Sequence, residues 1–219
     1  LRKGANNARG DNASNLKYAL VSWLIGMYHP LEQPLNTSTK DNRGFENRTT
    51  GSLLCPIDYD WSDNNVRECH RDFLVTADSW PTFLYESPSE YNQEDPDCGL
   101  FQSSLLLKTF KLIFTSPSSA QEDNRLASVP WDRPHHGEKS TRCHVAALLG
   151  MKSVTSRAIA YTAMMGQLHF ALLSVSSWRR FDGDFDLLGF YSNVLDWFEG
   201  PGNVTHQKHV KELLLWWDG

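Results

Sequence analysis

The stretch TSRAIAYTAMMGQLHFALLSVSSW, from Thr155 to Trp178, decides the fold class of this chain. It is long enough for about seven helical turns and contains no proline. Many of its apolar residues follow one another at spacings of three and four, and others, such as Ile159 and Phe170, lie outside that stripe. A helix that is apolar on more than one side is buried on more than one side. The stretch therefore predicts the central helix of an all-α domain.

The same periodicity predicts further helices on both sides of this stretch. We expect a single compact helical domain of six to seven helices, at about 15–28, 63–73, 100–115, 142–149, 155–178, 186–198 and 204–217. Residues 1–62 are expected to form an N-terminal helix and an irregular arm that wraps the same domain. Residues 63–219 are expected to form the helical core, with a polar loop at 116–141 that is rich in proline.

The last two predicted helices should complete the core against the central one. Short connections join three consecutive amphipathic segments, so these segments must bury their apolar stripes on one another. We therefore expect Leu168 and Leu172 to be fully buried against four residues of the last two helices: Phe190, Tyr191, Leu213 and Trp217.

The charges of the chain are unevenly distributed around a net charge of −5. Residues 58–97 hold eleven acidic and two basic side chains, whereas residues 98–180 hold ten basic and four acidic ones. Such blocks attract each other or form opposed patches on the surface. An acidic chain is a poor nucleic-acid binder, although the central basic block keeps nucleic acid as an alternative partner.

No stretch is typical of a membrane span, because the longest helix carries Arg157, Gln167 and His169. The four cysteines are too far apart for a zinc knuckle. A chain this rich in apolar residues needs no disulfide to fold. We therefore expect an intracellular protein, in the cytoplasm or nucleus, rather than a secreted one, with no membrane association and no cofactor.

The motif that most resembles a catalytic site is His70-Arg71-Asp72. A histidine and an aspartate two residues apart supply two ligands in non-haem iron oxygenases, and His144 or His169 is a candidate for the third. Those enzymes place the pair on a strand of a barrel, whereas this chain is helical. A chance tripeptide at a helix end is the favoured interpretation. The phosphate-binding, hydrolase and zinc-protease motifs are absent from the sequence, so no catalytic residue is predicted.

Aromatic side chains lie within the acidic block and suit a protein-binding face. The candidates for such a face are Trp61, Trp80, Tyr85 and Tyr91, together with the basic residues Lys108, Lys111, Arg179 and Arg180. The leading hypothesis is a non-catalytic interaction module whose partner is a protein. The alternatives are a metal-dependent oxygenase that uses His70 and Asp72, and a nucleic-acid-binding module that uses the central basic block.

Four blocks of the sequence resemble, in order, one known family. They are GLFQSSLLLKTFKLIFTSPSSA (Gly99–Ala120), LLGMKSVTSRAIAYTAMMGQLHFALLSVSSW (Leu148–Trp178), FYSNVLDWFE (Phe190–Glu199) and KELLLWW (Lys211–Trp217). The family is an uncharacterised domain of unknown function that occurs in many paralogous copies in mushroom-forming fungi. The resemblance implies a fungal intracellular protein. It implies no activity, cofactor or catalytic residue.

Overall fold

The computed structural model describes residues 2–28, 31–39, 41–68, 74–121, 145–170, 181–182 and 185–219, with the backbone alone at 2–14, 168–170 and 181–182. This part of the chain contains eight α-helices and confirms the all-α prediction. They are α1 (Arg2–Met27), α2 (Arg48–Leu54), α3 (Asn64–Arg67), α4 (Ser104–Phe110), α5 (Val145–Leu148), α6 (Ser156–Phe170), α7 (Leu187–Glu199) and α8 (Val204–Asp218). The described strands, β1 (Phe181–Asp182) and β2 (Phe185–Asp186), form one short antiparallel pair.

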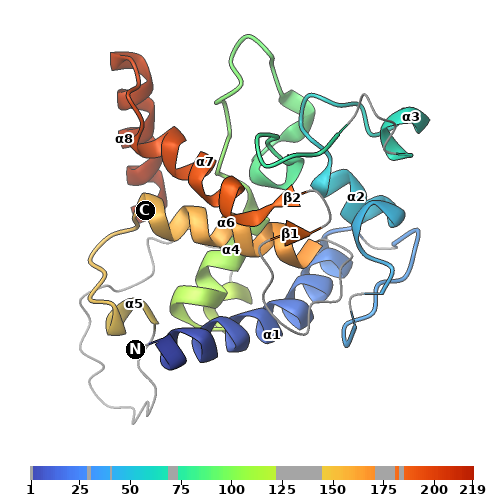
Figure 1. The fold of residues 1–219 in the computed structure, drawn as a ribbon, viewed down its shortest axis with the longest axis horizontal. Coiled ribbons are helices and arrows are strands. Elements are labelled where there is room, and N and C mark those ends of the chain that lie inside the picture. Colours follow the sequence, from blue (N-terminus) through green and yellow to red (C-terminus); the bar gives the residue numbers. More distant parts are fainter. Residues whose placement is uncertain are drawn as a thin grey trace.

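Helix α6 is the centre of the molecule, as its sequence predicts. In Figure 1 it lies between α7 on one side and α4 and α1 on the other. Ala158, Ile159, Ala163 and Met165 are each at most 6% exposed, although they point in different directions around the helix. Residues 171–178 of the predicted central helix lie outside the described residues.

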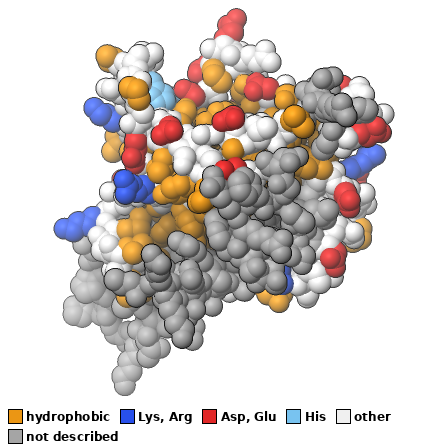
Figure 2. Space-filling view, viewed as in Figure 1, with side chains coloured by type: hydrophobic (Ala, Val, Ile, Leu, Met, Phe, Trp, Pro, Cys, Tyr) orange, Lys and Arg blue, Asp and Glu red, His pale blue; other side chains and the backbone are white. Residues whose placement is uncertain are grey.

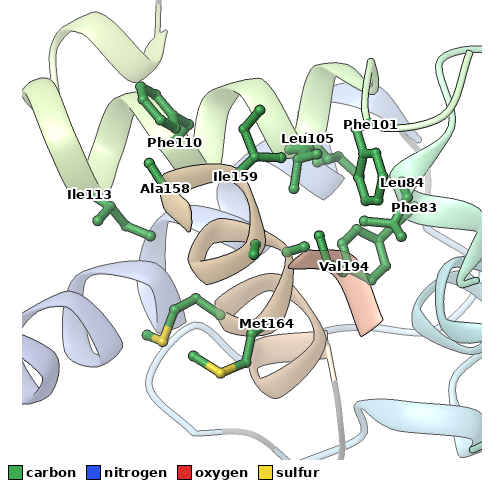
Figure 3. Packing of buried hydrophobic residues seen from close by; sticks show 14 of the residues in the cluster. Phe83, Leu84, Phe101, Leu105, Phe110, Ile113, Ala158, Ile159, Met164 and Val194 are labelled. Atoms are coloured by element: carbon green, nitrogen blue, oxygen red, sulfur yellow. The ribbon is translucent and has the colours of Figure 1, made fainter. Parts of the chain in front are cut away.

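One apolar cluster joins seven of the described α-helices, namely α1, α2 and α4 to α8. Figure 3 shows Phe83 and Leu84 of the loop before α4, together with Phe101, Leu105 and Phe110, gathered around α6. Trp217 closes the cluster from α8, with its ring centroid 5.2 Å from that of Phe110.

Residue 172 and the side chain of residue 168 lie outside the described structure. The predicted burial of Leu168 and Leu172 therefore stays a prediction. Three of their four expected neighbours, Phe190, Leu213 and Trp217, are buried.

The helix predicted over 100–115 has two parts. Helix α4 begins at Ser104 because the Ser103 hydroxyl accepts a hydrogen bond from the Leu106 amide at 3.0 Å. From Lys111 to Thr115 the backbone forms a π-helix, the wider turn that accommodates an extra residue. Leu105, Phe110 and Ile113 of this segment enter the core, and Lys111 is only 2% exposed.

The arm contains one helix that the sequence pattern did not predict. Asn47 begins α2 by accepting hydrogen bonds from the amides of Thr49 and Thr50, at 3.0 and 3.2 Å. Leu53 and Leu54 of α2 then enter the core. The arm is therefore partly helical and contributes its own apolar side chains to the common cluster.

Arg43 attaches the arm to α1. Its side chain is fully buried, and its Nη2 donates hydrogen bonds to the carbonyl oxygens of Lys17, Thr39 and Asn36 at 2.7, 3.2 and 3.3 Å. Burial lowers the pKa of Arg43 to about 10, which still leaves the guanidinium protonated at neutral pH. One cation therefore connects α1 with residues 36–39 of the arm.

Replacing Arg43 with methionine should destabilise the fold by about 2–3 kcal/mol, because three carbonyl groups lose a charged donor. Arg48→Met is the control, since Arg48 makes a 3.1 Å ion pair with Glu32 in which both side chains are more than 60% exposed. That loss should cost less than about 1 kcal/mol. Urea unfolding of both variants measures the difference, and equal losses would show that Arg43 does not anchor the arm.

Substitution by alanine should change the stability of the protein in opposite directions at two helical glycines. Glycine costs up to about 1 kcal/mol relative to alanine inside a helix. A Cβ on Gly166 would lie 2.9 Å from Cε2 of Phe83, which is itself 2% exposed and held by the core. Overpacking of this kind costs about 1–3 kcal/mol, so Gly166→Ala should be destabilising. A Cβ on Gly26 of α1 meets nothing within 4 Å, so Gly26→Ala should be stabilising. Thermal unfolding of the two variants tests both signs.

Candidate binding surface

An acidic loop projects from the core between residue 86 and α4. Its two ends are joined where the Glu86 amide donates to the Gly99 carbonyl oxygen at 2.9 Å. Gly99 has a φ of +71°, a backbone conformation that glycine adopts without strain. Four acidic side chains of the loop, Glu86, Glu90, Glu94 and Asp95, are exposed to solvent, and Asp97 is half-buried.

Six carboxylates form what we call the acidic face: Asp58, Glu86, Glu90, Glu94, Asp95 and Asp97. Figure 2 shows acidic side chains gathered near the top of the molecule, where Figure 1 draws the projecting green loop. Within the described part of the chain, the one basic side chain within 4 Å of these six carboxylates is His206, whose Nδ1 lies 3.7 Å from Asp97 Oδ2. The acidic and basic blocks of the sequence were expected to attract each other or to form opposed patches. On this face, the described basic residues neutralise few of the carboxylates.

Two tyrosines lie beneath the acidic face. The Tyr91 hydroxyl donates to Asp58 Oδ1 at 2.6 Å, and the Tyr85 hydroxyl donates to the Pro96 carbonyl oxygen at 3.1 Å. Their rings meet nearly at right angles, with centroids 5.6 Å apart.

Burial, the hydrogen bond to Asp58 and the negative charges of Asp58 and Asp97 raise the pKa of Tyr91 to about 12. The pKa of Tyr85 is also raised, mainly by burial and further by nearby negative charge. Both phenols are therefore neutral hydrogen-bond donors at physiological pH.

Asp97 ties the acidic loop to α7 and α8. Its Oδ1 accepts a hydrogen bond from Trp197 Nε1 at 3.0 Å. His206 Nε2 lies 2.6 Å from the Trp197 carbonyl oxygen and must donate to it, because a carbonyl only accepts. The remaining His206 nitrogen, Nδ1, then faces Asp97. The hydrogen bond from Trp197 Nε1 thus holds the loop against α7, about a hundred residues further along the chain.

The structure separates the four aromatic residues predicted for a binding face. Tyr85 and Tyr91 lie together, as described above. Trp80 packs under the surface, with its ring centroid 5.6 Å from Phe101 and 6.3 Å from Phe190. Trp61 lies against Phe45 in the arm and α2 region.

The predicted basic candidates do not gather on one described surface. Lys111 is buried, so its side chain is not on a surface that another protein could contact. Lys108 is half-buried beside α1. Arg179 and Arg180 lie outside the described residues, so the basic surface that includes them stays a prediction.

The candidate metal ligands His70, Asp72 and His144 also lie outside the described residues. In the part of the chain that the structure describes, no three histidine, cysteine or carboxylate side chains lie close enough to hold a metal ion. Asp186 is not part of such a group and begins α7 by accepting a hydrogen bond from the Leu188 amide at 3.0 Å. The oxygenase hypothesis stays untested by the described geometry.

The fold and surface define a helical domain with a buried central helix and a projecting acidic loop. The chain belongs to the family of unknown function DUF6698, whose model matches residues 3–219. This match confirms the resemblance to an uncharacterised domain. No curated protein and no solved structure matches the chain. Among the described helices, none combines the length and apolar character needed to cross a membrane.

Tyr91→Phe should lower stability by about 1 kcal/mol at pH 7–9, because it removes the hydrogen bond to Asp58. The folded-state pKa of about 12 exceeds the ordinary value of 10.0, so this contribution is complete below pH 10 and is lost as the pH rises through about 12. Unfolding free energies measured across this range should converge for wild type and variant. Tyr18→Phe, at a side chain 50% exposed, is the control and should change little at any pH. If the unfolding free energies of wild type and Tyr91→Phe differed by the same amount up to pH 12, the raised pKa of Tyr91 would be contradicted.

Proposed function

We propose that this protein is a non-catalytic interaction module whose acidic face binds a basic, lysine- or arginine-rich segment of another protein. The observation that carries the proposal is the acidic face itself, where His206 is the one described basic side chain within 4 Å of six carboxylates. Charges of one sign that crowd a surface repel one another and attract counter-charges. A basic partner segment relieves that repulsion, and an acidic one increases it.

The groups around the acidic face suit recognition better than chemistry. Tyr91 and Trp197 are half-buried aromatic residues beside the carboxylates, and such rings attract cations as well as apolar contacts. The raised pKa of Tyr91 leaves its phenol neutral, so it is not poised as a nucleophile or base at neutral pH. Asp58 and Asp97 are engaged in hydrogen bonds that position the loop.

An intracellular location is part of the proposal. Cys98, one of the described residues, is an exposed free thiol. Exposed free thiols persist in reducing compartments, where disulfides are rare. The fungal, multi-copy character implied by the resemblance likewise stays a prediction.

The test measures binding of a fluorescein-labelled arginine-rich peptide by anisotropy. Glu94→Lys/Asp95→Lys reverses two exposed charges at the tip of the acidic face. Asp41→Lys/Glu46→Lys makes the same change in net charge at two exposed residues of the arm. We expect the first variant to lose about tenfold in affinity and the second less than about twofold. The wild-type affinity should fall steeply with salt, since exposed charges are screened.

Equal losses in the two double variants would mean that the peptide responds only to net charge, and the acidic face would not be a site. Binding of a duplex DNA in place of the peptide would support the nucleic-acid alternative. Circular dichroism of each variant checks that the fold is retained.

A further inference from the structure

A pocket of about 400 Å³ lies between the end of α1 and the helices α2 and α3, which Figure 1 labels. We call it the α2–α3 pocket. Its volume is within the range of about 300–1,000 Å³ that is usual for small-molecule sites. Its described lining combines two arginines, two aromatic rings and several hydroxyl groups. Such a lining suits an anionic ligand that also has a flat, apolar part.

The two arginines of the pocket have donors to spare. Arg67, at the end of α3, donates to Asn64 Oδ1 and forms no ion pair within the described part of the chain. Arg48, at the start of α2, donates from Nη1 to Glu32 Oε2 at 3.1 Å. A guanidinium carries five N–H donors, and its planar fork matches two oxygens of a phosphate. Both side chains therefore keep N–H groups that an oxyanion can use.

Trp61 gives the same pocket a flat wall. Gly51 of α2 lets the indole approach closely, since a Cβ on that glycine would lie only 2.5 Å from Cη2 of Trp61. Phe45 packs against the indole with ring centroids 6.1 Å apart. The indole is thus held in place by two neighbours and still remains partly exposed. Aromatic side chains presented in this way stack on the flat faces of nucleic-acid bases.

Glu32 is the one carboxylate among the described lining residues. Its side chain is 66% exposed and that of Arg48 is 61% exposed, so solvent weakens their ion pair and a phosphate can compete for the arginine. Asp60, the residue before Trp61, is not among the described lining residues and accepts two hydrogen bonds from Ser62. Two arginines against one glutamate leave the pocket with an excess of positive charge.

We propose that the α2–α3 pocket binds a mononucleotide, with its phosphate on Arg48 and Arg67 and its base on Trp61. The positive charge disfavours a purely apolar ligand, and the indole favours a phosphate compound with a flat ring over phosphate alone. A carboxylate of an acidic peptide could reach the arginines but would leave the indole without a flat partner. This inference does not rest on the proposed function, because the pocket and the acidic face use different residues and attract opposite charges.

The probe is adenosine monophosphate, titrated into the full chain by calorimetry, with adenosine and inorganic phosphate as ligands that each lack one half. The nucleotide should bind at least about tenfold more tightly than either half. Arg67→Gln and Trp61→Leu should each weaken its binding at least about tenfold. Arg157→Gln, which removes the same charge from an exposed side chain of α6, is the matched control and should change little. Glu32→Gln should tighten binding about threefold, because it frees Arg48 from its counter-charge.

The inference is overturned if no saturable binding occurs up to about 1 mM nucleotide. Inorganic phosphate or adenosine that binds as tightly as the nucleotide also overturns it, and so do equal losses in Arg67→Gln and Arg157→Gln. A short single-stranded oligonucleotide that binds more tightly than the nucleotide would make a nucleic-acid strand the ligand instead. Circular dichroism checks each fold, and if Trp61→Leu unfolds, the exposed-charge variants and the two half-ligands still decide.

A further variant separates this site from the acidic face. Glu94→Lys/Asp95→Lys should bind the nucleotide at least as well as wild type, because its substitutions lie outside the pocket. A loss of nucleotide binding there would contradict a separate site. A failure of the arginine-rich peptide alone would count only against the acidic face.

Discussion

The arrangement of this domain depends on the backbone of Phe101. This buried residue has a φ of +59°, in the left-handed region that bulky residues avoid at a cost of about 1–3 kcal/mol. In that conformation its carbonyl oxygen accepts a hydrogen bond from Trp217 Nε1 at 3.1 Å. Its ring lies 5.1 Å from Trp197 and 5.6 Å from Trp80 between centroids. The acidic loop, α7, α8 and the start of α4 therefore meet at one strained residue, which the surrounding aromatic contacts keep in place.

Periodic apolar residues were sufficient to predict the helices that carry the core. Helices α6, α7 and α8 lie where the spacing of three and four predicts them, because each buries a stripe against its neighbours. Helix α1 extends to Arg2, well before the predicted start near residue 15. Its first turns are rich in asparagine and glycine and have no apolar period to signal a helix. Helix α2 is short and depends on the Asn47 cap and on core contacts from elsewhere in the chain.

The candidate surface was predictable only in its composition. The acidic block and its tyrosines are visible in the sequence, but the pairing of Asp58 with Tyr91 and of Asp97 with Trp197 depends on tertiary contacts. For Lys111, the sequence predicted a surface position that the structure does not show. Its spacing from Lys108 indicates a shared side of one helix, but not that this side faces the core. A lysine among Phe110, Leu112 and Ile113 is carried inward with them.

The anchoring of the arm by Arg43 has a consequence for handling the protein. Its hydrogen bonds to Lys17, Thr39 and Asn36 are made to backbone carbonyl groups from a buried position, where dissolved ions screen weakly. Most carboxylates of the acidic loop are exposed, so any ligand that they attract by charge is subject to screening. High ionic strength should then weaken binding at the acidic face, while the arm stays attached to α1.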